Sequence, residues 1–245
     1  MTQEIEIGMG KSGRMCYALD DVAIVPSRRT RDPQDVNTSW QVDAYEFDIP
    51  IVGAPMDSSM SPDTIITLGK LGGLGVLDLE GVWTRYENPL PQLEKITHAS
   101  DEEATRVLQQ VYSEPIKPEL ITARIQQIRD AGVTVAAALT PQRTQEFYST
   151  VVAAGVDLFV IRGTAVSAEH ISQTHEPLNL KKFIYELDVP VIVGGAGTYR
   201  AAMHLMRTGA AGVLVGSGGS AVSSSRTILG MHVPMATAIA DIAAA

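Results

Sequence analysis

The chain has 245 residues and a formal net charge of −9, which argues against a general nucleic-acid or anionic-membrane surface because a polyanion would be repelled. Hydrophobic residues make up 45% of the chain, aromatic residues only 5%, and 21 glycines favour short aliphatic strands joined by tight turns, hence an α/β fold. The single cysteine, Cys16, excludes an intrachain disulfide or a cysteine-based metal cluster, and we expect it to be buried or half-buried.

No apolar run approaches the ~20 residues that a membrane span needs, and the N-terminus lacks the basic-then-apolar pattern of a signal peptide. We therefore expect a cytoplasmic protein with no membrane partner and no nucleic-acid partner.

The N-terminal residues 1–48 are expected to form an arm, and beyond them short apolar runs alternate with segments of helical spacing. The apolar runs, which we predict to be strands, are 49–55, 72–78, 133–139, 157–162, 190–195 and 212–217. The predicted helices are 62–71, 118–130, 142–154, 178–187 and 199–208. Residues 80–117 interrupt the alternation as a polar insertion with a weakly amphipathic, helical middle, too short for most independent domains.

Apolar strands that alternate with helices pair in parallel through right-handed crossovers. The phrases "AGVTVAAAL", "AGVDLFVI" and "TGAAGVLVG" are near-repeats, and quasi-identical units favour a TIM (β/α)8-type barrel over an open sheet. Only about six βα units are found, so we expect a single partial barrel domain over residues 1–245, truncated before its last two units. The alternative is an open sheet with an unpaired edge, which would promote aggregation.

Four stretches carry a family resemblance: "YALDDVAIVPSRRT", "IPIVGAPMDSSMSP", "LGGLGVL" and "DVPVIVGGAGTYRAAMHLMRTGAAGVLVGSGGSAVSSSRTILGMHVPMATAIAD". Together they resemble the IMP dehydrogenase and GMP reductase family, in which a similar arm precedes the first barrel strand. The arm and the short insertion look most like the IMP dehydrogenase-related type. The insertion has no room for the regulatory CBS pair that IMP dehydrogenases usually carry after the second strand.

The resemblance implies a purine nucleotide oxidoreductase. Its substrate would be a purine 5′-monophosphate (IMP, XMP or GMP), its cofactor NAD or NADP, its reaction hydride transfer at purine C2, and its assembly a homotetramer. The direction of the reaction and the choice between NAD and NADP are left open. Two alternatives also remain, a nucleotide-binding or regulatory protein that has lost its nucleophile and a non-functional fragment.

The family's nucleophile is a cysteine in the loop after the sixth strand, and here its position is Ser223, with Ser225 as a second catalytic candidate. A serine hydroxyl stays protonated near neutral pH without an adjacent base, so the usual covalent chemistry is in doubt. The resemblance also implies a monovalent cation in this loop, at Gly218, Ser220 and Ser223.

The other site residues implied by the resemblance follow strand ends. Substrate contacts fall on Met56, Gly216, Gly218, Gly219 and Ser220, whose glycine and serine N–H groups are expected to face an anion. Cofactor contacts fall on Arg162, Gly163 and Thr164. The family's asparagine after the fifth strand and a phosphate-binding serine in the sixth loop are replaced by Ala196 and Ala221.

Three side chains have two interpretations each. Arg162 stands where the family has an aspartate. It is either a ligand contact, to a phosphorylated ribose or a xanthine oxygen, or a structural arginine that is solvated or salt-bridged. His170 is a proton shuttle or a solvated neighbour of a helix cap. Asp57 is a functional group at a strand's carboxyl end or an acceptor in a structural turn.

Overall fold

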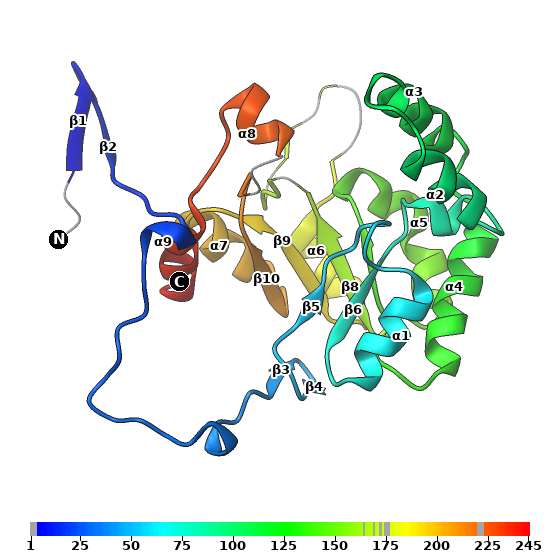
Figure 1. Cartoon of the computed structure of the whole chain (residues 1–245), viewed down its shortest axis with the longest axis horizontal. Helices are drawn as coiled ribbons and strands as arrows, with labels where there is room; N and C mark the ends of the chain where they lie inside the picture. The colour runs from blue at the N-terminus through cyan, green and yellow to red at the C-terminus, as the bar shows by residue number, and fades with distance from the viewer. Residues whose placement is uncertain (1–3, 164, 169, 172, 174–176, 220–222) are drawn as a thin grey trace.

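The computed structural model describes residues 4–163, 165–168, 170–171, 173, 177–219 and 223–245. Its centre is a curled, six-stranded parallel sheet with helices on its outer side (Figure 1). In spatial order the strands are β10 (Gly212–Val215), β9 (Val191–Ala196), β8 (Leu158–Arg162), β7 (Ala136–Leu139), β6 (Leu74–Asp78) and β5 (Val52–Gly53). Each strand pairs with the next one along the chain, so the prediction of six βα units of a partial TIM barrel is confirmed.

The five predicted helices are present, with ends that differ by no more than two residues from those expected. They are α1 (Pro62–Lys70), α4 (Pro118–Asp130), α5 (Pro141–Ala153), α6 (Leu180–Glu186) and α7 (Tyr199–Met206). Three begin at a side-chain cap: Ser61 accepts a hydrogen bond from the N–H of Thr64, and Asn179 and Thr198 do the same for α6 and α7. Proline in the first turn of the other two fixes a helical backbone angle.

Strands β6 to β9 bury side chains on both faces, because helices cover one face and the curl of the sheet encloses the other. The outer cluster packs β6 to β9 against the helices, and it includes Leu77, Ala137, Phe159, Ile161 and Val193. The inner cluster takes the alternate residues Leu74, Val76, Ala136, Ala138, Leu158, Val160 and Ile192.

The expected arm contains a hairpin that closes the amino end of the sheet, a feature absent from the prediction. Strands β3 (Trp40–Val42) and β4 (Tyr45–Phe47) pair antiparallel, and Val42 and Phe47 join the inner cluster. The Trp40 ring stacks on Phe47 with centroids 4.7 Å apart. The hairpin therefore supplies core side chains that the strands alone lack.

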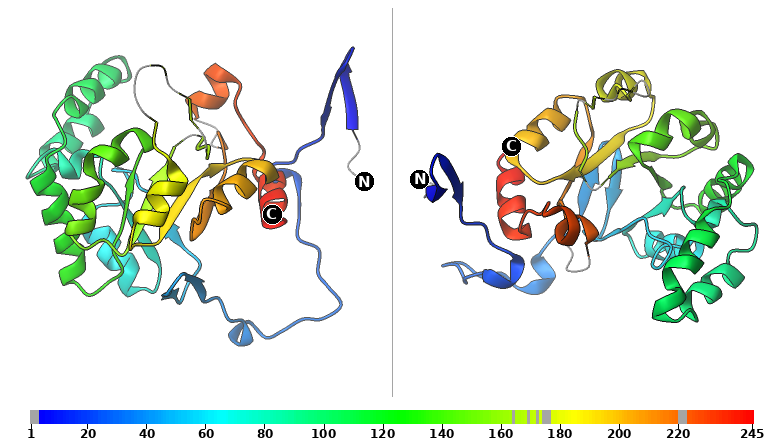
Figure 2. Two further views of the ribbon diagram at one scale, coloured as in Figure 1. Left: turned by 180° about the vertical axis from the view of Figure 1, so that it is seen from behind. Right: turned by 90° about the horizontal axis from the view of Figure 1, so that it is seen from above.

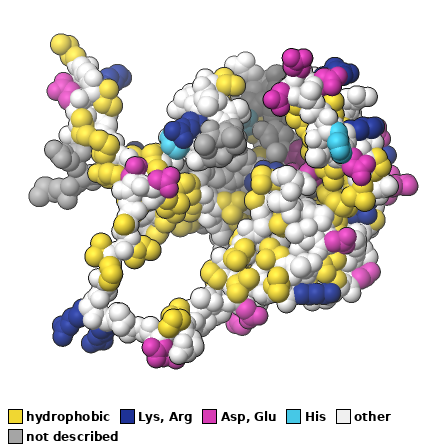
Figure 3. Space-filling model, viewed as in Figure 1, with side chains coloured by type: hydrophobic (Ala, Val, Ile, Leu, Met, Phe, Trp, Pro, Cys, Tyr) yellow, Lys and Arg dark blue, Asp and Glu magenta, His cyan; other side chains and the backbone are white. Residues whose placement is uncertain are grey.

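The first part of the arm is extended and touches the rest of the chain near its other end (Figures 1 and 2). It contains β1 (Glu4–Gly8), β2 (Lys11–Arg14) and the 3-10 turns Leu19–Asp21 and Pro33–Asp35. Arg14 forms an ion pair with Asp241 in helix α9 (Met235–Ala243), and the Tyr17 N–H donates to Thr237 Oγ1 at 2.8 Å. Hydrophobic side chains along this segment are exposed (Figure 3). Ile24 is fully exposed.

The insertion contains the 3-10 turn η3 (Val82–Thr84) and two helices, α2 (Leu90–Thr97) and α3 (Asp101–Tyr112), which pack on each other. Cys16 is half-buried, as expected. Among the described residues, no helix is both long enough and apolar enough to cross a membrane.

Candidate functional site

The carboxyl ends of the parallel strands lie on one edge of the sheet, which we call the carboxyl edge. Asp78 and Arg162 are the last residues of β6 and β8, Met56 and Asp57 follow β5, and Gly216 follows β10. Parallel strands that end together bring distant parts of the sequence to one edge, where barrel folds place their active sites. Predicted residues from three separate strands therefore share this edge.

Arg162 is held by an acidic partner from a neighbouring part of the sheet. Its Nη2 donates to Asp78 Oδ2 at 2.9 Å, and Asp78 Oδ1 accepts from the N–H of Glu80 at 2.9 Å. Of the two interpretations given for Arg162, the salt-bridged one is present in the structure. The arginine side chain still has 37% of its surface exposed, so it also faces the solvent above the edge.

The environment of Asp78 disfavours its charged form. Burial raises the pKa of the Asp78 carboxyl, and the negative charges of Asp57 and Glu80 add to this effect. The Glu80 N–H and the Arg162 guanidinium oppose it by stabilising the carboxylate. The ion pair between Arg162 and Asp78 thus offsets only part of the free-energy cost of burying the Asp78 carboxylate, so it contributes little to the stability of the fold.

Asp57 accepts hydrogen bonds from the insertion. Its Oδ2 accepts from the Tyr112 hydroxyl at 2.5 Å and from the Val82 N–H at 2.9 Å, which matches the structural interpretation. Burial and the bond to Asp57 raise the pKa of Tyr112, so its hydroxyl stays protonated as a donor. Sequence reasoning missed Tyr112, because the only local signal is a tyrosine at the end of a weakly amphipathic helix.

The segment after β10, residues 216–234, is called the glycine loop. The Gly216 N–H donates to the Ala196 carbonyl at 2.7 Å and so continues the ladder between β10 and β9. The expectation that this N–H faces an anion is therefore wrong for this conformation, because the group already has an acceptor. Gly218 and Gly219 remain the described backbone donors near the predicted phosphate site.

The base of the glycine loop is closed by contacts between its two ends. The Val233 N–H donates to the Ser217 carbonyl at 3.0 Å, and His232 Nδ1 lies 3.0 Å from the Gly218 carbonyl oxygen. A proton on Nδ1 would place a donor at one of the carbonyls expected to ligate a monovalent cation. Ser220, a second expected ligand, lies outside the described residues.

Ser223 precedes the short helix α8 (Ser224–Leu229) and is half-buried. Its carbonyl accepts from Thr227 Oγ1 at 3.2 Å, whereas its hydroxyl has no hydrogen-bond partner among the residues that the structure describes. The ring of His232, the nearest histidine in the sequence, is turned to Gly218. No described base is therefore placed to take the Ser223 proton.

Ser225 lies half-buried in the first turn of α8, and its carbonyl accepts from the Met231 N–H at 3.1 Å. This backbone bond gives it a place in the loop but no catalytic neighbour. Thr164 and Ala221, which the sequence also singled out, lie outside the described residues.

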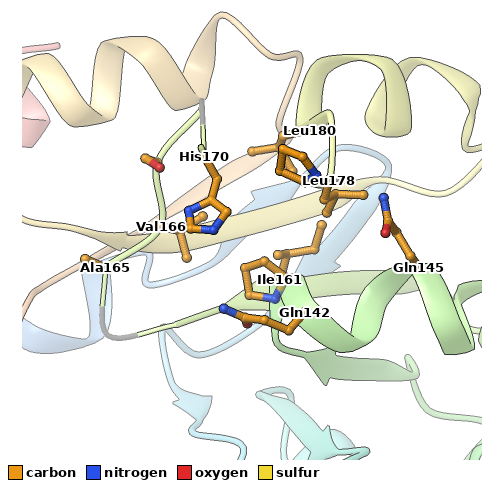
Figure 4. A pocket seen from close by; sticks show the side chains of 11 residues that line it. Gln142, Gln145, Ile161, Ala165, Val166, His170, Leu178 and Leu180 are labelled. Carbon is orange, nitrogen blue, oxygen red and sulfur yellow. The ribbon is translucent and has the colours of Figure 1, made fainter. Parts of the chain in front are cut away.

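A cavity of about 170 Å³ lies beside the carboxyl edge, between the first turn of α5 and the segment after β8 (Figure 4). Its apolar walls include Ile161 and Val166, and its polar lining includes Gln142, Gln145 and His170. His170 is exposed and contributes to the lining of this cavity, in the segment after β8, whereas Ser223 lies after β10. Nothing in the described contacts links the two residues.

Among the described side chains, no group of three or more His, Cys, Asp or Glu residues is arranged to hold a metal ion. The carboxylates of the edge are instead used as acceptors and as the partner of Arg162.

Comparisons with known proteins agree with this arrangement. Residues 16–245 match the model of the IMP dehydrogenase / GMP reductase domain. Proteins from Mycolicibacterium smegmatis and Mycobacterium leprae, both described as uncharacterized oxidoreductases, are 51% and 49% identical over 98% of this chain. An inosine-5′-monophosphate dehydrogenase from Methanocaldococcus jannaschii is 25% identical over 94% of this chain and 64% of its own length.

A crystal structure of an IMP dehydrogenase/GMP reductase-like protein from Corynebacterium glutamicum superposes with a TM-score of 0.91. It shares 46% identity and is matched over 98% of this chain and 64% of its own length. The chain likewise spans only 66% of the two actinobacterial oxidoreductases. On the matched domain, the chain belongs to the IMP dehydrogenase/GMP reductase family of oxidoreductases.

Proposed function

We propose that the chain is part of an NAD- or NADP-dependent oxidoreductase that transfers hydride at C2 of a purine 5′-monophosphate, IMP or XMP. The observation that carries the proposal is the carboxyl edge, where Met56, Arg162 and the glycine loop lie on the same side of the sheet. In a family whose reactions take place at this edge, these residues are suited to contact a base, an anionic or carbonyl oxygen and a phosphate.

Four residues at the carboxyl edge are assigned ligand contacts in this proposal. The Met56 side chain, 48% exposed, offers an apolar surface for a purine ring. The backbone N–H groups of Gly218 and Gly219 suit the phosphate. The exposed side of Arg162 favours a ligand with an extra oxygen or negative charge, which makes XMP and NADP the better-matched members of each pair.

The residues beside the edge also fit a nicotinamide cofactor. The cavity next to Gly163 has the apolar walls and carboxamide groups that suit one flat ring system of a dinucleotide, with Gln142 and His170 as polar neighbours. When bound, the cofactor supplies the donor or acceptor of hydride. The residues that line the cavity, His170 among them, then orient the cofactor and exclude water.

A second candidate is a nucleotide-binding protein without turnover, and Ser223 favours it. A covalent step at C2 needs a nucleophile that is ionised near neutral pH and later leaves, and a thiolate meets both needs better than an alkoxide. The Ser223 hydroxyl has no described base to activate it.

Calorimetric titration with IMP, XMP and GMP tests the binding part of the proposal. We expect weak binding, because the Gly216 N–H is occupied and each lost hydrogen bond to an anion costs about 1.5–3 kcal/mol. Absence of binding to all three, in a chain extended to the length of its relatives, would exclude both candidates.

Absorbance of reduced nicotinamide tests turnover, using the extended chain with Ser223 and with Ser223→Cys. Turnover only by Ser223→Cys would support the covalent mechanism and a chain that is itself impaired. Equal turnover by both would exclude a covalent role for this position, and nucleotide binding without turnover by either would favour the binding protein. The homotetramer implied by the family is part of the proposal and is tested by light scattering on the same extended chain.

A further inference from the structure

The insertion reaches the carboxyl edge through one side chain. Tyr112 is the last residue of α3, and its hydroxyl donates to Asp57 Oδ2 at 2.5 Å across 55 residues of sequence. Asp57 directly follows Met56, the residue proposed to pack on the purine base. A polar contact thus joins the insertion to the turn that carries a substrate-binding side chain.

We propose that Tyr112 is a positioning residue, which fixes the turn carrying Met56 by donating its hydroxyl hydrogen to Asp57. The inference rests on the proposed function for the role of Met56. The mechanical link between Tyr112 and the turn stands on geometry alone and is testable without any ligand.

The position of the Asp57 carboxylate is fixed by its contacts with the insertion. Its Oδ2 accepts only from Tyr112 and Val82 among the described residues, and Oδ1 is buried without a partner there. A Cβ atom built on Gly81 would lie 2.2 Å from Asp57 Oδ1, so the carboxylate packs directly on the backbone of the insertion. Removal of the Tyr112 hydroxyl would leave Val82 as the single described donor.

The turn after β5 moves with Asp57 because it is closed by short backbone bonds. The Met56 carbonyl accepts from the N–H groups of Ser59 and Met60 at 3.0 and 2.9 Å. A shift of the Asp57 backbone therefore changes the same peptide units that orient the Met56 side chain. The N–H groups of Ser59 and Met60 report directly on whether the turn is closed.

Arg85 keeps the Tyr112 ring in place independently of its hydroxyl. Its Nη1 donates to the Tyr112 carbonyl at 3.0 Å, its Nε donates to the Glu80 carbonyl at 3.0 Å, and its Cζ lies 5.7 Å from the ring centroid. Tyr112→Phe keeps the ring, and the backbone bonds of Arg85 remain. That substitution removes the bond to Asp57 and little else.

The first measurement is hydrogen–deuterium exchange at the Ser59 and Met60 amides of the nucleotide-free chain. For Tyr112→Phe we expect exchange to become about tenfold faster, corresponding to about 1.4 kcal/mol of lost protection. The control is Tyr185→Phe, since Tyr185 lies on α6 with 89% of its surface exposed. Unchanged exchange in Tyr112→Phe, or equal acceleration in both variants, would overturn the inference.

The second measurement compares calorimetric affinity for IMP with that for ribose 5-phosphate, which lacks the base. Tyr112→Phe should weaken IMP binding about three- to tenfold while leaving ribose 5-phosphate binding unchanged, because Met56 contacts the base alone. Equal weakening of both ligands would indicate general loosening and refute the positioning role. If the wild-type chain, extended to the length of its relatives, binds none of IMP, XMP and GMP, the proposed function fails, and the exchange experiment still decides whether Tyr112 fixes the turn.

Discussion

The two sides of the carboxyl edge are built in different ways. Around β5, β6 and β8, side chains hold one another: Tyr112 donates to Asp57, and Arg162 pairs with Asp78. At β9 and β10, close backbone contacts shape the edge, since a Cβ on Gly195 would lie 2.0 Å from the Gly216 carbonyl oxygen. Substitutions on the first side should therefore destabilise the fold by removing a hydrogen-bond or ion-pair partner. Substitutions on the second side should destabilise it by adding atoms where the backbone leaves no space.

The largest effect is expected on the glycine side, for Gly218→Ala. Gly218 has φ +64°, and a Cβ there would lie 2.3 Å from the Met231 carbonyl oxygen. Left-handed strain of about 1–2 kcal/mol and overpacking of about 1–3 kcal/mol together predict a loss of about 3 kcal/mol in the free energy of unfolding.

Gly230→Ala is the matched control, measured by the same denaturant titration. Gly230 has φ +67° in the same loop but nothing within 4 Å of a built Cβ, so only the strain should appear. If both variants lose the same free energy, crowding does not shape this side of the edge.

On the other side, Asp57→Ala should lower the free energy of unfolding by about 2 kcal/mol, because hydrogen bonds to a charged acceptor contribute about 1.5–3 kcal/mol and Tyr112 can reach water. Asp35→Ala, at an exposed turn of the arm, should change it by less than about 0.5 kcal/mol. Chemical denaturation measures both, and an equally small effect at Asp57 would mean that side-chain partners do not hold this side.

The sequence predicted the strands better than it predicted the side-chain contacts at the edge, because the strand signals are local and the contacts are long-range. Alternating apolar runs and helical spacing are local, so the six strands and their order followed from them. The contact of Arg162 with Asp78 spans 84 residues, and that of Tyr112 with Asp57 spans 55. Neither contact has a local pattern, so both interpretations of Arg162 stayed open and Tyr112 was missed.

Of two further differences, the first has a local signal in the sequence and the second has none. The β3–β4 hairpin has a two-residue turn with Asp43 at φ 51°, flanked by alternating aromatic and aliphatic residues, which is a hairpin signal. The glycine loop was expected to offer the Gly216 N–H to an anion. The strand instead extends its ladder by one residue to Ala196, which composition does not reveal.

A smaller, pH-dependent effect is expected for Arg162→Met. Burial raises the pKa of Asp78 above its unfolded value of about 3.9, so the stability that Asp78 contributes is full below that pH and is lost as pH rises through the folded pKa. Arg162 opposes this loss, so its removal should cost about 1 kcal/mol near pH 7, after allowance for its partial exposure, and almost nothing near pH 4.

Thermal unfolding across this pH range tests the expectation, with Arg143→Met as control. Arg143 pairs with Glu146 at 2.7 Å on the exposed face of α5 and should contribute only a few tenths of a kcal/mol. If the loss of unfolding free energy caused by Arg162→Met instead grew toward acid pH, Arg162 would not be stabilising the charged form of the buried Asp78 carboxyl.

The smallest change in the free energy of unfolding is expected for Ser223→Ala. This variant compares a hydroxyl that caps a helix with one that has no described hydrogen-bond partner. Ser223 and Thr198 both precede a helix, but Thr198 accepts from the Ala201 N–H at 3.2 Å, whereas the Ser223 side chain makes no cap bond. Loss of a working cap costs about 1 kcal/mol, so Thr198→Ala should show that loss. Ser223→Ala should stay within about 0.5 kcal/mol of the parent chain.

Urea titrations of the two variants measure the difference directly. A loss at Ser223 equal to that at Thr198 would mean that the Ser223 hydroxyl makes a hydrogen bond in the folded protein. The argument that no base activates Ser223 would then fail, because it depends on this hydroxyl having no described partner.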